Sequence, residues 1–143
     1  MFKHRYKGWC LRTLSPIPSG AFIMEYVGER IDSEVEKART FRVPDMEVYL
    51  METFKETNVK IDALGVRNIA AFAAFACRTK FANMRKVGWL SHHWDKSVSH
   101  AVYIAKRDIQ PGEELTYLRL DKEPPANSSK NCGCGDPDCS GKL

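Results

Sequence analysis

Residues 68–77 read NIAAFAAFAC, the longest stretch of the chain that is poor in polar residues. Ile69, Phe72, Ala73 and Ala76 recur at the spacing of one face of a helix, which predicts a short buried helix here. The stretch ends in a cysteine, and three further cysteines follow near the end of the chain. We therefore expect this segment to pack at the centre of the fold, supply one metal ligand and border a binding pocket.

Size and composition place the chain among ordinary globular domains. It has 143 residues, enough for one domain with its own core, and 43% of them are hydrophobic and 28% charged. No apolar run approaches the length that spans a bilayer, and no secretory signal follows the basic start, so no membrane association is expected. The formal net charge of +4 is mild, and direct nucleic-acid binding is not expected from it.

Short apolar and aromatic runs bounded by turn residues predict a mostly β fold with two short helices. Ser33 and Glu36 form a capping-box pattern, which predicts that a polar helix covers residues 34–40. The expected strands cover residues 11–20 together with a turn, and then 21–29, 48–51, 59–61, 87–90, 100–105 and 114–120. Residues 56–58 are expected to turn the chain between two of these strands, and residues 78–82 and 92–97 to form loops.

A polar stretch near the C-terminus marks a linker. It carries Pro124, Pro125, Ser128 and Ser129. The chain therefore divides into a main domain at 1–121, a linker at 122–130 and a cysteine-rich segment at 131–143, which is too short to have its own core.

The closing cysteines form the pattern C-x-C-x4-C through Cys132, Cys134 and Cys139. Glycines between them let the backbone wrap closely, and three thiolates suit tetrahedral Zn²⁺ at Zn–S distances of about 2.3 Å. With no secretory signal, five cysteines indicate metal ligation or buried thiols rather than disulfides. The candidates for a fourth ligand are Cys77, Cys10 and a histidine. Cys77 is preferred because it ends the central segment where the chain turns back into a loop.

Several segments, in this order, resemble the SET domain of protein-lysine methyltransferases, and the closing cysteines resemble its post-SET segment. The matching segments are GWCLR at 8–12, IPSGAFI at 17–23, EYVGE at 25–29, YL at 49–50, IDA at 61–63, NIA at 68–70, DI at 108–109 and GEELTY at 112–117. The resemblance covers nearly the whole chain. It implies small β-sheets around a threaded, pseudo-knotted segment.

The resemblance also implies a function. It is methyl transfer from S-adenosylmethionine to a histone-tail lysine, in chromatin and therefore in the nucleus, with the histone tail or another lysine-containing peptide as partner and chromatin-complex subunits as further expected partners. In the family, a cysteine at the position of Cys77 joins three post-SET cysteines on one zinc ion. The positions that correspond to cofactor-binding residues are Gly8, Trp9, Cys10, Tyr26, Ala74 and Phe75, and those that correspond to catalytic residues are Tyr49 and Tyr117.

The chain departs from the family pattern at positions that carry the chemistry. The Asn–His pair that helps to hold the cofactor is replaced by Ala74 and Phe75, and a lost buried hydrogen bond costs about 1–3 kcal/mol. The final tyrosine, which orients the lysine amine, is replaced by Arg119, a cation expected to disfavour the sulfonium of the methyl donor. These changes predict weak cofactor binding.

Four further departures concern the same pocket. Cys10 and Arg67 each replace a glycine, Ala71 replaces an arginine, and residues 78–81 carry a three-residue insertion. Two hypotheses follow. The chain is a methyltransferase by family, with weak or lost activity, or it is a catalytically inactive SET domain that acts as a protein- or peptide-binding scaffold in chromatin.

Overall fold

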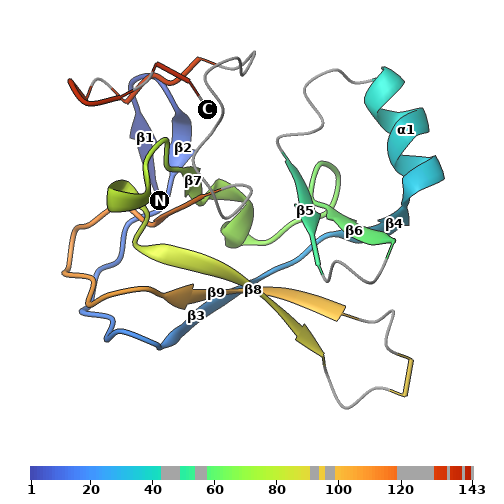
Figure 1. The fold of residues 1–143 in the computed structure, drawn as a ribbon, viewed down its shortest axis with the longest axis horizontal. Coiled ribbons are helices and arrows are strands. Elements are labelled where there is room, and N and C mark those ends of the chain that lie inside the picture. The colour runs from blue at the N-terminus through green and yellow to red at the C-terminus, as the bar shows by residue number, and fades with distance from the viewer. Residues whose placement is uncertain are drawn as a thin grey trace. The chain divides into compact units, whose positions relative to one another are not determined.

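Short β-strands in three sheets make up most of the fold (Figure 1). The computed structural model describes residues 1–42, 49–53, 58–90, 94–95, 99–118, 131–134, 136–139 and 141–142. In chain order the strands are β1 (Phe2–His4), β2 (Gly8–Cys10), β3 (Phe22–Tyr26), β4 (Glu29–Asp32), β5 (Leu50–Glu52), β6 (Val59–Asp62), β7 (Ala74–Phe75), β8 (Met84–Leu90), β9 (Ser99–Ala105) and β10 (Thr116–Tyr117). Within the described ranges they are joined by the α-helix α1 (Ser33–Arg42) and the 3₁₀ helices η2 (Ile69–Phe72) and η3 (Thr79–Phe81). The predicted mostly β fold is confirmed.

The strands pair as a two-stranded sheet of β1 and β2, a five-stranded sheet in the order β3-β9-β8-β10-β7, and a three-stranded sheet in the order β4-β6-β5. The chain divides into two compact units, which are described separately below. The first contains residues 1–23, 72–86 and 104–143, and the second contains residues 24–71 and 87–103. No helix in the described part of the chain is long and apolar enough to cross a membrane.

In the first unit, Asn83 holds β10 in its place. The asparagine is 2% exposed; its Nδ2 donates to the Glu114 carbonyl at 2.8 Å, and its Oδ1 accepts from the Thr116 amide at 2.9 Å. Strand β10 pairs in parallel with β7, with Thr116 opposite Ala74. A buried side-chain amide that satisfies two backbone groups fixes strand register, because leaving either group unpaired is costly.

In the second unit, charged contacts rather than apolar burial attach α1 to the three-stranded sheet. The helix has no buried residue. Arg39 contacts Glu29 at 2.7 Å and Asp62 at 2.8 Å, and Lys60 contacts Glu36 at 2.6 Å. Since Asp62 is only 2% exposed, its carboxylate depends on the guanidinium for charge compensation.

The start of α1 differs from the predicted capping box. Asp32 caps the helix, because its Oδ1 accepts from the amides of Glu34 at 3.0 Å and Val35 at 2.8 Å. The Ser33 hydroxyl instead accepts from Asn58 Nδ2 at 2.9 Å, and Glu36 is engaged by Lys60. The predicted helix is therefore confirmed, but the predicted cap was one residue too late.

The helix predicted for residues 68–77 was wrong. The chain forms one 3₁₀ turn, η2, and then the short strand β7, while Ile69 is 58% exposed. The amide of Ala74 donates to the Leu115 carbonyl at 3.2 Å, and that of Ala76 donates to the Tyr117 carbonyl at 2.8 Å. Pairing with β10 therefore overrides the helical spacing of the apolar residues.

The remaining strand predictions were confirmed in part. Strands at 59–61, 87–90 and 100–105 are confirmed, and that at 48–51 appears as β5, which pairs with β6 as expected for a hairpin. The strand predicted within 11–20 is replaced by isolated bridges from Arg12 to Glu114 and from Ile17 to Ile109, and the run at 21–29 is divided into β3 and β4. Residues 56–57, the linker at 122–130 and most of the loop at 92–97 lie outside the described residues.

Candidate functional site

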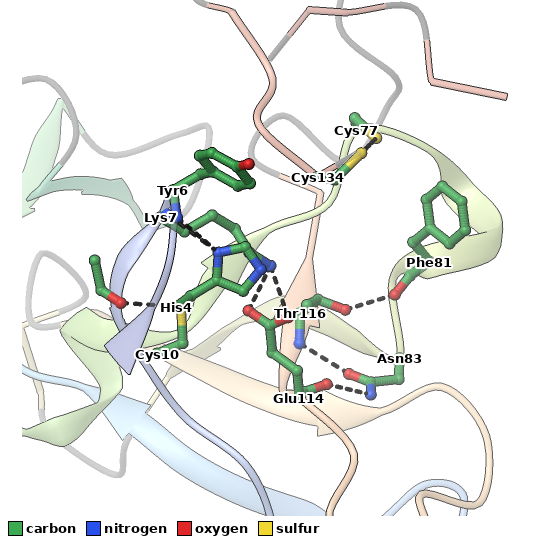
Figure 2. Close-up of polar contacts among 11 residues, drawn as sticks. His4, Tyr6, Lys7, Cys10, Cys77, Phe81, Asn83, Glu114, Thr116 and Cys134 are labelled. Carbon is green, nitrogen blue, oxygen red and sulfur yellow. Dashed lines mark hydrogen bonds and ion pairs between the residues drawn. The ribbon is translucent and has the colours of Figure 1, made fainter. Parts of the chain in front are cut away.

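Four cysteine sulfurs converge in the first unit. The Sγ atoms of Cys77, Cys132, Cys134 and Cys139 all lie within 4.8 Å of one another, and Figure 2 shows Cys77 beside Cys134, with 3.7 Å between their sulfurs. Sulfurs at the corners of a tetrahedron about 2.3 Å from a central zinc are separated by roughly 3.8 Å. The donor set and its spacing therefore fit a tetrahedral metal ion, and this is the predicted combination of cysteines.

Local structure holds the closing segment in a tight loop. The Cys132 amide donates to the Gly141 carbonyl at 2.8 Å, and the Cys139 amide donates to the Asp136 carbonyl at 3.0 Å. A Cβ at Gly133 would lie 2.9 Å from the Cβ of Tyr6, so only glycine permits this approach of the loop to the turn between β1 and β2.

The thiols of the cluster differ in pKa. Burial raises the pKa of Cys77 and of Cys132, and neighbouring thiols raise that of Cys77 further. The Gly141 amide donates to Cys139 Sγ at 3.2 Å, and this hydrogen bond lowers the pKa of that thiol to about 7. A bound cation would favour the thiolate form of every member.

Among the described residues, the other candidates for the fourth ligand have contacts elsewhere. Cys10 does not belong to the cluster; its thiol is 1% exposed and donates to the Gly8 carbonyl at 3.8 Å. His4 accepts two backbone amides at Nδ1, and His100 pairs with Glu25 at 2.5 Å. Among the described residues, Cys77 is therefore the ligand that completes the set.

An ion pair that the sequence did not suggest covers the buried thiol of Cys10. Figure 2 shows the Lys7 ammonium against the Glu114 carboxylate, with Nζ 2.6 Å from both oxygens, and the His4 ring beside them. Burial, together with Glu114, raises the pKa of Cys10 to about 11. His4, Lys7 and Glu114 border a cavity of about 370 Å³, whose wall also includes Phe75, Phe81, Thr116 and Cys134. Lys7 and Glu114 are 107 positions apart, so no local sequence pattern could have paired them.

The first unit also brings together Phe75 and Tyr117, two positions that the family resemblance assigns to cofactor binding and catalysis. Phe75 on β7 and Tyr117 on β10 are paired in the sheet, and their rings meet edge to face with centroids 5.2 Å apart. Ala74 is 9% exposed, and its backbone amide is taken by the Leu115 carbonyl. Gly8 and Trp9 lie on β2, where Gly8 has a φ of 79° and Trp9 is 55% exposed. Arg119 lies outside the described residues.

The second unit brings together Tyr26 and Tyr49, two further positions that the family resemblance singles out. The Tyr26 hydroxyl donates to the Tyr49 carbonyl at 2.8 Å, and Tyr26 is 3% exposed. The guanidinium carbon of Arg67 lies 4.8 Å from the centroid of the Tyr49 ring, and Arg67 also donates to the Leu64 carbonyl at 2.5 Å. A cation therefore covers one face of a tyrosine ring that the resemblance makes catalytic. The arginine at the family's glycine position was the sequence signal for this contact.

Comparisons with known proteins agree with this architecture. The family model described as SET domain matches residues 8–118. The chain is 30% identical over 150 residues to an Arabidopsis thaliana histone-lysine N-methyltransferase, H3 lysine-9 specific SUVH5, and 34% identical over 145 residues to a Homo sapiens histone-lysine N-methyltransferase, H3 lysine-36 specific. Both matches cover 100% of this chain, which spans only 18% and 5% of the lengths of those relatives.

Solved structures show the same likeness. One, described as the structural basis for the product specificity of histone lysine methyltransferases, superposes with a TM-score of 0.82 at 26% identity over 99% of this chain and 54% of that one. KRYPTONITE in complex with mCHH DNA, an H3(1–15) peptide and SAH superposes with a TM-score of 0.74 at 27% identity over 99% of this chain and 28% of that one. The chain therefore belongs to the SET domain family, and its relatives are histone-lysine methyltransferases.

Proposed function

We propose that this chain is a SET-domain histone-lysine methyltransferase in which S-adenosylmethionine binds weakly, so that methyl transfer to a histone-tail lysine is slow or absent. The observation that carries the proposal is that the two side chains of β7 are apolar. Ala74 offers no polar side chain, and the ring of Phe75 packs against that of Tyr117. Neither residue can replace the side-chain hydrogen bonds of the family's Asn–His pair, each worth about 1–3 kcal/mol when buried.

The roles of the other positions follow from the family. S-adenosylmethionine, when bound, supplies an electrophilic methyl group on a sulfonium. Backbone groups of Gly8, Trp9 and Cys10, together with Tyr26, would hold this donor. Tyr49 would line the pocket for the incoming lysine, and Tyr117 would stand where the family tunes how many methyl groups are added. Arg119 replaces the tyrosine that orients the lysine amine, and alignment of this kind supplies much of the rate of a displacement reaction.

We further propose a structural Zn²⁺ held by the four clustered cysteines, because their sulfur spacing and chemistry suit tetrahedral coordination. Residues 131–143 would then be a post-SET segment joined to the SET domain at 1–121 through the linker at 122–130. The chain would work in chromatin, and so in the nucleus, with a histone tail and chromatin-complex subunits as partners. A histone partner accords with its longer relatives, which are histone-lysine N-methyltransferases specific for lysines of H3.

A second function is favoured by one contact. Arg67, at a position where the family has glycine, covers one face of the Tyr49 ring, with 4.8 Å between its guanidinium carbon and the ring centroid. A domain in which the family's catalytic tyrosine is covered in this way would bind a protein or peptide without catalysis, as a scaffold in chromatin. Binding of a histone-tail peptide that does not depend on S-adenosylmethionine would favour this alternative.

Calorimetric titration with S-adenosylmethionine tests the proposal. The unmodified chain should give little or no heat at micromolar concentrations, whereas an Ala74→Asn, Phe75→His variant should bind measurably. Micromolar affinity in the unmodified chain would overturn the proposal of a weakened site. The same titration with an H3 peptide, with and without the methyl donor, separates the enzyme from the scaffold.

A further inference from the structure

The insertion at residues 78–81 contacts the cysteine segment. The Nε and one terminal nitrogen of Arg78 donate to the Asp138 carbonyl at 3.0 and 2.8 Å, and the Lys80 ammonium lies 2.5 Å from the Asp138 carboxylate. Asp138 directly precedes the cluster member Cys139, and Arg78 directly follows Cys77. Two basic residues of the insertion, which begins directly after Cys77, therefore contact Asp138, the neighbour of Cys139.

The insertion packs on buried residues of the first unit. The Phe81 side chain packs against the buried side chains of Ala76, Ala82 and Leu118, and its carbonyl accepts from the Thr116 hydroxyl at 2.5 Å. The Lys80 ammonium also lies 4.9 Å from the centroid of the Phe81 ring, a cation–π contact that restrains the lysine. Lys80 thus lies on the short helix η3, and Arg78 directly precedes it, while Phe81 anchors the helix in the core of the first unit.

The other end of the cysteine segment has its own contact. Gly133 lies against Tyr6 at a distance that excludes any side chain, so the loop between Cys132 and Cys134 is also positioned by protein atoms. Within the segment, the Asp138 amide donates to Asp136 Oδ1 at 2.9 Å, and this hydrogen bond fixes Asp138 in the turn that carries Cys139. None of these contacts includes a sulfur atom, so none requires a metal ion.

We infer that Arg78 and Lys80 form a latch on Asp138 that holds the cysteine segment beside Cys77 before metal binds, and thereby tightens the metal site. This inference rests on the proposed metal site. Closing a loop around an ion costs conformational entropy, and contacts that hold the loop closed remove part of that cost. The latch residues would act as positioning residues, and they would not be metal ligands.

The expected change in metal retention follows from how far the side chains of the latch are exposed to solvent. The side chains of Lys80 and Asp138 are 53% and 68% exposed, and an exposed ion pair changes an equilibrium by at most about fivefold. The paired donation from Arg78 to a carbonyl is charge-assisted, so its loss should change metal retention by roughly tenfold. The lysine contribution should shrink in high salt because exposed charges are screened.

Zinc transfer from the loaded protein to a chromogenic chelator tests the latch. Lys80→Gln and Asp138→Asn should each speed zinc release by about threefold. Their combination should be no worse than the larger single effect, because both changes remove one pair. Exchanging the charges with Lys80→Asp and Asp138→Lys should restore slow release, and Arg78→Gln should speed it by roughly tenfold. The matched control is Lys60→Gln, which breaks the ion pair to Glu36 in the second unit and should leave release unchanged.

Hydrogen exchange of the metal-free protein gives a second readout that does not depend on zinc. The amides of Cys132 and Cys139 should be protected in the metal-free chain and lose protection in the Arg78→Gln, Lys80→Gln double variant. Equal protection in both proteins, or full additivity of Lys80→Gln and Asp138→Asn in zinc release, would overturn the latch. Absence of zinc from the purified protein, with this difference in protection intact, would instead overturn the metal site alone.

Discussion

The ring of Phe75 lies edge-on to the ring of Tyr117, with centroids 5.2 Å apart and an angle of 61° between the planes. Parallel pairing of β7 with β10 imposes this contact, because the two residues are direct partners in the sheet. Tyr117 is 4% exposed, so the aromatic pair is well packed. An aromatic residue is therefore packed at a position where the family resemblance predicts a polar one.

Restoring the polar pair should recover cofactor binding. An Ala74→Asn, Phe75→His variant should bind S-adenosylmethionine at least tenfold more tightly, about 1.4 kcal/mol, because a buried side-chain hydrogen bond becomes available. Calorimetry measures the affinity. Phe75→Leu is the control, since it removes the aromatic pair without adding a polar group and should not strengthen binding. Unchanged affinity in the double variant would point to Cys10 or the insertion at 78–81 as the obstacle.

The purified protein should carry about one Zn²⁺ per chain, and Cys77→Ser should lower this content strongly, because a structural zinc site needs four ligands. Metal analysis after gel filtration provides the measurement. Cys10→Ser is a matched control, since Cys10 is equally buried but does not belong to the cluster, and it should keep its zinc. Full zinc in Cys77→Ser would show that another residue completes the site.

Attachment of α1 should depend on Arg39. In Arg39→Gln the carboxylate of Asp62, which is 2% exposed, loses its charge partner, so the free energy of unfolding should fall by more than in a variant that breaks an ion pair without a buried carboxylate. Lys60→Gln breaks a more exposed pair and should cost at most about 1 kcal/mol. Urea denaturation compares the two variants. Equal losses would show that burial of Asp62 does not set the strength of this contact.

Glu113 predicts a stability difference that depends on pH. Arg107, at 2.6 Å, and then the Gln110 amide lower the pKa of Glu113 from 4.5 to about 2. A lowered carboxyl pKa contributes stability above the unfolded-state value, and this contribution is lost as pH falls from about 4.5 to 2. Because the pair is partly exposed, Glu113→Gln should lower the free energy of unfolding by only about 1 kcal/mol at pH 7. The two proteins should converge near pH 2, and a difference that persists there would argue against this ion pair as its cause.

How far the sequence predicts this structure depends on whether the interactions are local. The strands at 59–61 and 100–105 were predicted from short apolar runs and appear as β6 and β9. The central alanine-rich segment misled the prediction, since its spacing suited a helix while β10, about forty residues later, pairs with it as a strand. A local pattern contains no information about such a distant partner.

The same reasoning applies to the candidate site. The cysteine cluster was predicted because thiols at close spacing carry a chemistry of their own, and the structure brings the four together. The pair of Lys7 and Glu114 was not predicted, because neither residue type identifies its partner across 107 positions. The contacts of Arg78 and Lys80 with Asp138 were missed for the same reason, and the insertion was expected to act on the cofactor pocket.

Methyl transfer provides the final prediction. The unmodified chain should transfer radiolabelled methyl groups to histone-tail peptides very slowly or not at all. Arg119→Tyr alone should not rescue the reaction, because a site that binds its methyl donor weakly gains little from an aligned hydroxyl. Combined with Ala74→Asn and Phe75→His, it should raise the rate by more than the separate changes predict, since groups that act as a unit are not additive. The unmodified chain, Arg119→Tyr, the double variant and the triple variant should be assayed side by side with S-adenosylmethionine in excess. Robust transfer by the unmodified chain would contradict a weakened active site, and a triple variant no faster than the double variant would show that position 119 does not limit the reaction.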